Sequence, residues 1–592
     1  MRHGCGGLLK VAAITVLVAA SVGTAAAQDA TPTPPGCVAG SAGIGDGYFP
    51  TMGNGGYDVQ HYDLDLRIDV ETSEILAATA TIEALAVAAL CSFDLDFEGL
   101  DIDGITVDGR DAAWLRRGKE LVITPDQPLG AGDDITTVVR YHGTPIIQPG
   151  LGDGPPVGGD AATPVAAGAS SPAGVGGAGP DEATALPGGW FVAEDEVFIL
   201  GEPTGKRTWY PLNEHPADKA TYAFRFTVQE PYVVVTNGLK TGDNDNGATR
   251  MFTYASADPI ANYLVTFHAG RLEVEELEGP HGLPVTLSFA PTIPEDERAV
   301  YRRLPEMITW AETVFGPYPF ELAGATVVGA PFQIALETQT LPIFGAYGLE
   351  LEGGLSVEEL AALKTADIED TLVHELAHQW FGDAVSVQRW RDMWLNEGFA
   401  TYAQALWLEE TQGVDARDER LRGLYGAVLD ETRFLDPERL PTFTAADVLR
   451  GLQERGELLE DASVESFRSS LGAADDAALD DIPAENALDA LAAGGFPVSV
   501  FPGLAVLAGD PGPPSIFSYA TYDRGALTLH ALRLTVGDDA FFAILSGWVE
   551  RYGGGNAATA DLVAVAEEIS GQELSPLFDA WLFTLPTLDG IG

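Results

Sequence analysis

Short alternating runs of apolar and polar residues fill the chain from about residue 53 to residue 144. "YDVQHYDLDLRIDV" begins the pattern, and "ELVITP" and "DITTVVRYHG" continue it, with glycine, proline and aspartate between the runs. A period of two places alternate side chains on opposite faces of a strand. The pattern therefore predicts an antiparallel sheet domain, and further strand-like runs extend this domain to residue 270.

Helical spacing dominates the second half of the chain. "PEDERAVYRRLPEMITWAETVFG" predicts one amphipathic helix over 294–316, with acidic residues in its first turn. A strand is expected over 324–341, followed by one helix through "TLVHELAHQWFGD" and another through "WLNEGFATYAQALWLEE". These elements predict an α+β chain in which the sheet domain of 53–270 precedes a mainly helical domain of 271–592.

Three segments interrupt this periodicity. Residues 28–52 contain "DATPTPPG" and are expected to form a linker. Residues 145–189 are rich in glycine, alanine and proline, so we expect a disordered loop within the sheet domain. Residues 440–508 are acidic, rich in alanine and poor in aromatic residues, and we interpret them as a partly helical insertion.

The N-terminus is typical of a secretory signal peptide. Arg2, His3 and Lys10 give it a basic start, an apolar run follows, and small residues offer a cleavage site after Ala27. No later run approaches the ~18 uninterrupted apolar residues of a membrane span. We therefore expect residues 1–27 to be removed and the mature protein to be secreted, with no membrane association. The alternative is that the apolar run, which Lys10 interrupts, is retained as an anchor.

Two cysteines remain once the signal peptide and its Cys5 are removed. Cys37 and Cys91 lie on the exported part of the chain, where an oxidising environment permits a disulfide. The alternative is that Cys91, within "LAVAALCSFDLDF", is simply a small buried apolar residue.

The net charge of the chain argues against a nucleic-acid partner. The 592 residues include 88 acidic and 32 basic residues, for a formal net charge of −56. Nucleic-acid binding needs a basic surface, so we expect no nucleic-acid partner. The bland interpretation of the acidic excess is a well-solvated surface that keeps an exported protein soluble.

Candidate chemistry begins with two histidines four residues apart, His374 and His378. Residues at this spacing share one helix face, so both imidazoles can point at a single metal ion. Glu375, the residue after His374, projects beside this helix face. Its carboxylate can therefore reach another ligand of the ion without binding the ion itself. The H-E-x-x-H pattern is typical of zinc metalloproteases, and the alternative of coincidence has a probability of about one in a hundred.

A third ligand is available nineteen residues beyond His378, at Glu397. Catalytic zinc takes three protein ligands and leaves one position open. An antiparallel return of the next helix would bring Glu397 level with the two histidines. Glu397 is flanked by Trp394, Leu395 and Phe399, and a carboxylate on a buried face needs a charged or metal partner, which disfavours the alternative of a surface carboxylate.

These motifs resemble those of the aminopeptidase N family of gluzincin zinc metallopeptidases. "HELAHQWFGD" and "WLNEGFA" carry the resemblance, and "GEPTGKRTWYPLNEHPADKATYAF", "FGPYPFE" and "TYDRGALTLHALR" extend it over most of residues 50–592. It implies a saddle-like N-terminal β-sheet domain packed against a thermolysin-like catalytic domain. Larger members continue into a helical C-terminal domain, which we expect this chain to lack.

The resemblance also assigns roles to residues. It implies one zinc ion held by His374, His378 and Glu397, with Glu375 as general base. Peptides with free N-termini are the implied substrates, and their amine would be bound by Glu337 and by Glu202 of "LGEPTG". Glu337 lies with Ala335 in "IALET", where Ile334 and Thr338 depart from the family's glycine and asparagine, and Leu200 replaces a common glutamine before Glu202. Tyr522 of "TYDRG" matches the tyrosine that stabilises the oxyanion.

Other functions share parts of this pattern. A thermolysin-like endopeptidase would have the zinc ligands but no carboxylates for an amine. An epoxide hydrolase of the same superfamily normally carries the C-terminal domain. A zinc-containing protein that binds peptides without cleaving them would be expected to have lost Glu375 or Tyr522, and the chain retains both. The sequence does not indicate an oligomeric state.

Overall fold

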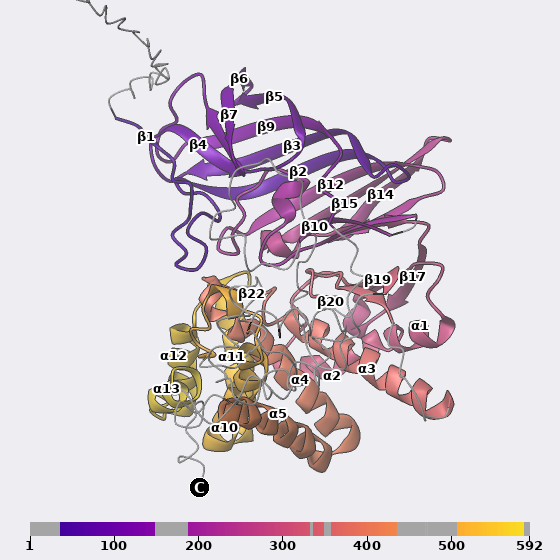
Figure 1. Cartoon of the computed structure of the whole chain (residues 1–592), viewed down its shortest axis with the longest axis vertical. Coiled ribbons are helices and arrows are strands. Elements are labelled where there is room, and N and C mark those ends of the chain that lie inside the picture. The colour runs from indigo at the N-terminus through magenta and orange to yellow at the C-terminus, as the bar shows by residue number, and fades with distance from the viewer. Residues whose placement is uncertain are drawn as a thin grey trace, which may run out of the picture.

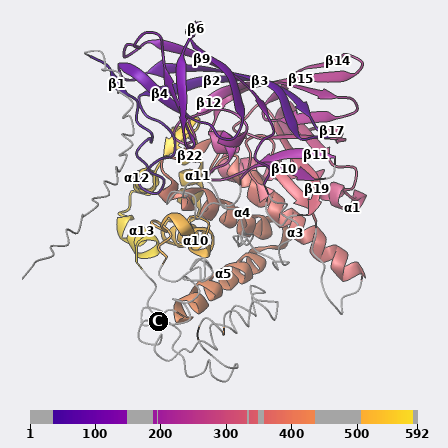
Figure 2. The same cartoon turned by 45° about the horizontal axis from the view of Figure 1, so that its top comes forward.

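The computed structural model describes residues 36–148, 188–193, 195–331, 335–347, 357–434, 468, 471 and 506–584. The expected signal peptide at 1–27, most of the loop at 145–189 and most of the insertion at 440–508 lie outside the described residues. Figure 1 shows a layer of sheets above a group of helices, and the turned view in Figure 2 shows the same division.

An eight-stranded sheet forms the main layer of the N-terminal part. Its strands lie in the order β14-β15-β12-β2-β3-β9-β5-β6, and every neighbouring pair is antiparallel except β2 and β12. Side chains along β2 alternate between buried and more exposed positions, as the period of two predicts. The strand bounds are β2 Tyr57–Asp69, β3 Glu74–Ala86, β5 Asp101–Val107, β6 Arg110–Asp111, β9 Asp134–Gly143, β12 Ala220–Gln229, β14 Leu239–Asp245 and β15 Thr249–Ile260.

Two four-stranded sheets complete this part, in the orders β1-β4-β8-β7 and β10-β11-β16-β13. Glu202 follows the last residue of β11 by two positions, so the second of these sheets places a candidate site residue. The bounds are β1 Val38–Ala39, β4 Leu90–Asp96, β7 Ala113–Arg117, β8 Glu120–Thr124, β10 Gly189–Ala193, β11 Glu196–Leu200, β13 Val233–Thr236 and β16 Phe267–Gly270.

The C-terminal part combines a mixed five-stranded sheet with a group of helices. The sheet order is β17-β18-β19-β21-β20, which leaves β20 at an edge. Strand bounds are β17 Glu273–Glu278, β18 Pro284–Phe289, β19 Ala323–Pro331, β20 Ala335–Leu336 and β21 Ile343–Ala346, and β22 Val385–Val387 pairs with β23 Gly555–Ala557. Helix bounds are α1 Glu295–Tyr301, α2 Leu304–Phe315, α3 Val357–His378, α4 Trp394–Gln412, α5 Val414–Phe434, α10 Gly525–Val536, α11 Asp538–Tyr552, α12 Thr559–Ser570 and α13 Ser575–Leu582. The expected α+β class is confirmed.

The single helix expected over 294–316 is wrong, because the segment forms α1 and α2 with a break between them. Pro305 lies in the first turn of α2. A proline in a continuous helix would clash with the carbonyl four residues earlier and remove a backbone hydrogen bond, so the chain starts a new helix instead. The strand expected over 324–341 is likewise divided into β19 and β20, and β21 lies between them in the sheet.

The linker expected at 28–52 is also wrong for its described residues, 36–52. β1 pairs with β4, Cys37 forms a disulfide with Cys91, and Phe49 is buried in the core. A disulfide removes conformational entropy from the unfolded chain, and a buried phenylalanine removes apolar surface from water. Together they hold a segment whose proline and glycine content alone predicts a mobile connection.

Polar contacts that are at least partly buried join the sheet domain to the C-terminal part. The Lys219 ammonium donates hydrogen bonds to the backbone carbonyls of Asp383 at 2.7 Å and Ala384 at 3.2 Å, just beyond the end of α3. His268 Nδ1 lies 2.8 Å from Thr326 Oγ1 on β19. Such contacts fix residues of the sheet domain relative to α3. No described helix has both the length and the apolar character needed to cross a bilayer.

Two carboxyl groups face each other inside the sheet domain and make its stability depend on pH. Asp96 and Glu120 are direct cross-strand partners on β4 and β8, both buried. Among the described residues, none donates a hydrogen bond to either oxygen of Glu120. Burial, and then the carboxylate of a neighbour, raises the pKa of Asp96 to about 7 and that of Glu120 to about 8.

We therefore expect the stabilising contribution of this pair to be lost as the pH rises from about 4 to about 8. Because the folded pKa values exceed the unfolded ones, the contribution of the pair is complete below the unfolded values and is lost on passing through the folded values. Glu120→Gln removes one of the two charges, so it should raise the melting temperature relative to the native protein at pH 8, by the equivalent of about 2 kcal/mol, but not at pH 5. Glu83→Gln, an exposed position on β3, is the matched control and should show no such pH dependence. A Glu120→Gln protein whose melting temperature parallels the native one at both pH values would contradict this prediction.

Candidate metal centre and active site

The two helices α3 and α4 bring three candidate ligands together. α3 ends at His378, and α4 begins at Trp394 with Glu397 in its first turn. Glu397 Oε2 lies 3.3 Å from His374 Nε2 and 3.5 Å from His378 Nε2. The ligand atoms of all three residues lie within 4.8 Å of one another. The convergence expected from the sequence is thus present in the fold.

The chemistry and spacing of these donors fit a zinc ion. Tetrahedral zinc with ligand distances of about 2.0–2.2 Å places its ligand atoms about 3.3–3.5 Å apart. His378 Nδ1 lies 3.1 Å from the carbonyl oxygen of Phe381, to which it donates its proton, and this leaves Nε2 free to bind a metal. Burial alone would raise the pKa of Glu397, but contact with His374 and His378 lowers it to about 2, so this ligand is ionised.

Glu375 and Glu337 lie beside the ligands on the other side of His378. Their carboxylate oxygens and a ring nitrogen of His378 lie within 4.8 Å of one another. Burial alone would lower the pKa of His378, but Glu337, Glu397 and Glu375 hold it well above its ordinary value. The same crowding acts on the carboxyl groups, because burial raises the pKa of both Glu375 and Glu337 above the ordinary value.

Glu337 follows directly after the edge strand β20. Ala335 on this strand pairs with Phe344 of β21, and no described strand pairs with the other edge of β20. An extended peptide can add to such an edge through its backbone. Among the described residues, none donates a hydrogen bond to the buried Glu337 Oε1.

Glu202 reaches the same site from the sheet domain. It is buried, and its carboxylate interacts electrostatically with those of Glu337, Glu397 and Glu375. Burial and then Glu337 raise the pKa of Glu202 well above its ordinary value. Within the described part of the chain, Glu202 Oε1 is buried without a hydrogen-bond donor. Two carboxyl groups from different domains thus interact electrostatically beside the ligand set, and one oxygen of each accepts no hydrogen bond from the described residues.

Tyr522 packs against His374, one of the three candidate metal ligands. It lies in a π-helical turn, η8 Ala520–Arg524, that runs directly into α10. Its ring stacks on His374 with the ring centroids 6.0 Å apart and the planes at 13°. Burial, followed by the carboxylates of Glu397, Glu202 and Glu337, raises the pKa of Tyr522 well above its ordinary value, so the phenol keeps its proton. π-helical turns occur frequently at functional sites.

Two site residues are missing from the sequence-based predictions. Lys206 is completely buried, and burial lowers its pKa to about 7 although Glu214, Glu202 and Glu337 oppose that shift. Gln379 donates a hydrogen bond from Nε2 to the backbone oxygen of Glu337 at 3.0 Å and accepts one from the Thr340 amide at 2.8 Å. The only sequence signal for either is proximity, since Lys206 follows "EPTG" and Gln379 follows His378.

Known proteins resemble this chain in both sequence and fold. Residues 303–433 match the peptidase family M1 domain. Aminopeptidase N of Streptomyces lividans is 25% identical over 408 residues, which are 66% of this chain and 38% of that protein. Glutamyl aminopeptidase of Bitis rhinoceros is 25% identical over 391 residues, which are 64% of this chain and 33% of that protein. The matched part of the chain thus spans about a third of the length of these relatives.

Solved structures cover much more of the chain. An M1 zinc metallopeptidase mutant from Deinococcus radiodurans, bound to a Tyr-Ser-Ala substrate, is 25% identical and superposes with a TM-score of 0.65 over 92% of this chain and 99% of that chain. A second structure of the metallopeptidase from the same organism is 26% identical, with a TM-score of 0.64 over 93% of this chain. These likenesses support the resemblance inferred from the motifs: residues 303–433 are similar to the peptidase family M1 domain, and the described fold is similar to that of solved M1 zinc metallopeptidases.

Proposed function

We propose that this protein is a zinc-dependent aminopeptidase that hydrolyses the N-terminal peptide bond of peptides. The observation that carries the proposal is the position of Glu202 and Glu337. Their carboxylates come from different domains and meet beside the His374, His378 and Glu397 ligand set. A site that cuts within a chain has no need for two buried carboxylates next to the ligands, whereas a free α-ammonium group would donate the hydrogen bonds that Glu202 Oε1 and Glu337 Oε1 do not receive from the described residues.

Each residue of the proposed active site has its own role in the hydrolysis. Zinc, when bound by His374, His378 and Glu397, supplies Lewis-acid activation of a water and of the scissile carbonyl. Glu375, next to the ligands, accepts the proton of the attacking water and delivers it to the leaving amine. The Tyr522 hydroxyl donates a hydrogen bond to the carbonyl oxygen as negative charge develops there.

Substrate position follows from the same geometry. Glu337 and Glu202 bind the α-ammonium group, and the free edge of β20 at Ala335 pairs with the substrate backbone. The amine therefore stops the peptide one residue from the ligands, which makes the first peptide bond the one that is cleaved. The combination of Glu375 and Tyr522 at the ligand set supports hydrolysis over simple peptide binding.

Replacement of Glu337 tests the anchor. Glu337→Gln keeps the shape of the side chain and removes its charge, so the KM for a free-amine peptide should rise by roughly a hundredfold, corresponding to ~3 kcal/mol for one buried charge pair. The measurement compares aminoacyl fluorogenic substrates with their N-acetylated forms. The native enzyme should ignore the acetylated forms, and the variant should lose much of this discrimination.

The matched control for this experiment is Glu573→Gln, at an exposed position before α13. It should keep both the KM and the preference for free amines. An unchanged preference in Glu337→Gln would show that the amine is bound elsewhere. Cleavage of acetylated peptides by the native enzyme would instead favour the endopeptidase alternative.

We also propose that the protein works after export. The disulfide between Cys37 and Cys91 supports this location, because disulfides persist mainly in oxidising compartments. Edman sequencing of the protein recovered from culture medium should begin at residue 28 if the signal peptide is cleaved where expected.

A further inference from the structure

Two glycines on different helices touch each other next to the proposed active site. A Cβ atom added at Gly398 would lie 2.8 Å from both the Cα and the carbonyl carbon of Gly525. A Cβ atom added at Gly525 would lie 2.8 Å from the Cα of Gly398. Carbon atoms in favourable contact are about 3.5–4.0 Å apart, so any larger residue at either position must push the two backbones away from each other.

The reason for glycine here is space and not backbone conformation. Neither Gly398 nor Gly525 has a positive φ, so an alanine could adopt the same backbone angles. Both lie in helices, where alanine is intrinsically favoured over glycine by about 1 kcal/mol. The sequence thus carries two unfavourable helix residues at a point where the backbones of α4 and α10 touch.

This contact lies between two functional side chains. Gly398 follows the metal ligand Glu397 directly, and Gly525 follows Tyr522 by three residues at the start of α10. Tyr522 is in electrostatic contact with the Glu397 carboxylate and stacks on the ring of His374. The separation of the two helix backbones at this point therefore sets the separation of the tyrosine from the ligand set.

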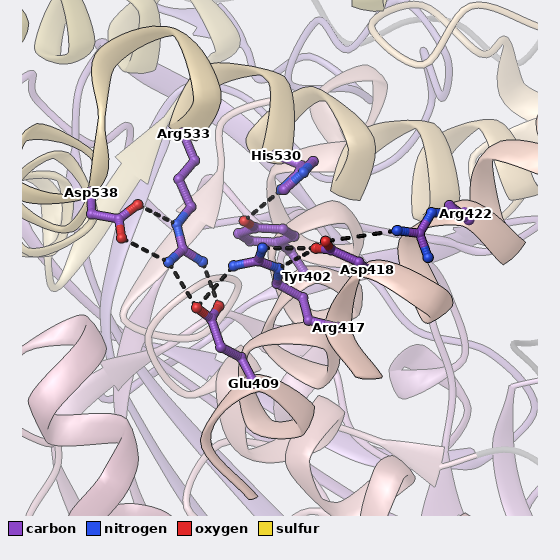
Figure 3. A network of polar contacts seen from close by, with 8 residues as sticks. All are labelled: Tyr402, Glu409, Arg417, Asp418, Arg422, His530, Arg533 and Asp538. Atoms are coloured by element: carbon purple, nitrogen blue, oxygen red, sulfur yellow. Dashed lines mark hydrogen bonds and ion pairs between the residues drawn. The ribbon is translucent and has the colours of Figure 1, made fainter. Parts of the chain in front are cut away.

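A second contact fixes the same two helices further along (Figure 3). Glu409 of α4 binds both terminal nitrogens of Arg533 of α10, at 2.7 and 3.1 Å. Arg533 also binds Asp538 at the start of α11, and Tyr402 of α4 contacts His530 of α10 at 3.1 Å. Because a two-point ion pair has fixed geometry, α10 cannot tilt freely to accommodate a bulkier residue at the glycine contact.

We propose that Gly398 and Gly525 are positioning residues whose backbone contact sets the distance between Tyr522 and the zinc ligand Glu397. This inference rests on the proposed function, in which Tyr522 stabilises the oxyanion. The two glycines touch neither substrate nor metal. They act through Tyr522, and a displacement of the phenol by a few tenths of an ångström lengthens the hydrogen bond on which turnover depends.

The test is a double-mutant cycle between Gly525→Ala and Tyr522→Phe. Gly525→Ala alone should lower kcat by roughly tenfold or more, with little change in KM, and the zinc content should remain at one per chain. Tyr522→Phe alone should lower kcat by about a hundredfold, the size typical of losing one oxyanion donor. In the Tyr522→Phe background, Gly525→Ala should change kcat by less than about twofold, because the hydroxyl that it displaces is already absent.

Gly423→Ala is the matched control, since Gly423 lies in α5 with no atom near its would-be Cβ. It should leave kcat unchanged in both backgrounds. An equal loss of kcat from Gly525→Ala with and without the Tyr522 hydroxyl would overturn the inference, as would a Gly525→Ala enzyme of normal kcat.

Failure of the inference and failure of the proposed function give different results. If Tyr522→Phe keeps normal kcat, the oxyanion role of Tyr522 is wrong whatever the glycine variants do. If Gly525→Ala does not fold, Glu409→Gln loosens the same helix pair without adding an atom. It should lower kcat severalfold only while the Tyr522 hydroxyl is present, and an equal loss in the Tyr522→Phe background would then reject the inference.

Discussion

His378→Ala is expected to leave the protein almost without zinc and to lower kcat/KM by about 10³-fold or more. His378 belongs, with His374 and Glu397, to a group of described residues whose ligand atoms lie within 4.8 Å of one another, and its Nε2 lies 3.5 Å from Glu397 Oε2. Its Nδ1 is already committed to the Phe381 carbonyl, so the imidazole is pre-oriented and no described histidine other than His374 lies in this group. Two ligands rarely retain zinc against dialysis, and the Lewis-acid chemistry is lost with the ion.

Zinc content measured by atomic absorption, together with hydrolysis of an aminoacyl fluorogenic substrate, checks this prediction. His142→Ala is a suitable control, because His142 is exposed on β9 and pairs with Asp103 far from the site in sequence and fold. The control should bind one zinc and keep its activity. A native sample that is demonstrably free of metal and fully active would contradict the whole assignment of the ligands.

Local sequence patterns predict the parts of this fold that depend on local contacts. The alternation in β2 and the apolar spacing in α3 each report one buried face, and both elements form as expected. The break between α1 and α2 was predictable in principle, because Pro305 lies in the middle of the expected helix. The amphipathic spacing continues across the break, which is why periodicity alone suggests one helix.

Packing between distant segments is where the sequence predictions fail. Residues 36–52 look like a linker because their composition is rich in glycine. Asp46 of this segment is nevertheless buried and accepts a hydrogen bond from the Trp390 amide at 3.0 Å. No local pattern reports a contact between residues separated by more than three hundred positions.

The residues of the candidate site likewise differ in whether local sequence predicts their position. His374, His378 and Glu397 lie close in sequence, and helix geometry alone brings the two histidines together. The position of Glu202 beside them depends on how the sheet domain packs on α3, and only the resemblance to a known family indicates it. Lys206 belongs to no catalytic motif and to no periodic apolar pattern. Its complete burial near Glu202 and Glu337 is therefore apparent only from the fold.

The Glu375→Gln enzyme should bind zinc normally and lose turnover, with kcat falling by about 10³-fold. Glutamine has nearly the same size as glutamate and cannot accept a proton, so the substitution separates proton transfer from metal binding. Glu375 lies one step round α3 from the ligand His374, and its carboxylate lies within 4.8 Å of the metal-binding histidine His378 without being part of the His374, His378 and Glu397 set. Removal of its charge should therefore leave the ligand set complete while no group remains to take the proton of the attacking water.

The decisive comparison is between zinc content, KM and kcat in the same preparation. Glu375→Gln should match the native protein in zinc content and should bind a free-amine peptide with similar affinity, since Glu337 and Glu202 still hold the amine. A fall in zinc content in parallel with kcat would instead make Glu375 a ligand, and a normal kcat would require another general base. Glu369→Gln, on the same helix but in an ion pair with Arg303, serves as the matched control, because it changes the charge of α3 without touching the site. If both glutamate variants lost activity equally, the effect would belong to the helix and not to proton transfer, and the mechanism proposed for Glu375 would have to be abandoned.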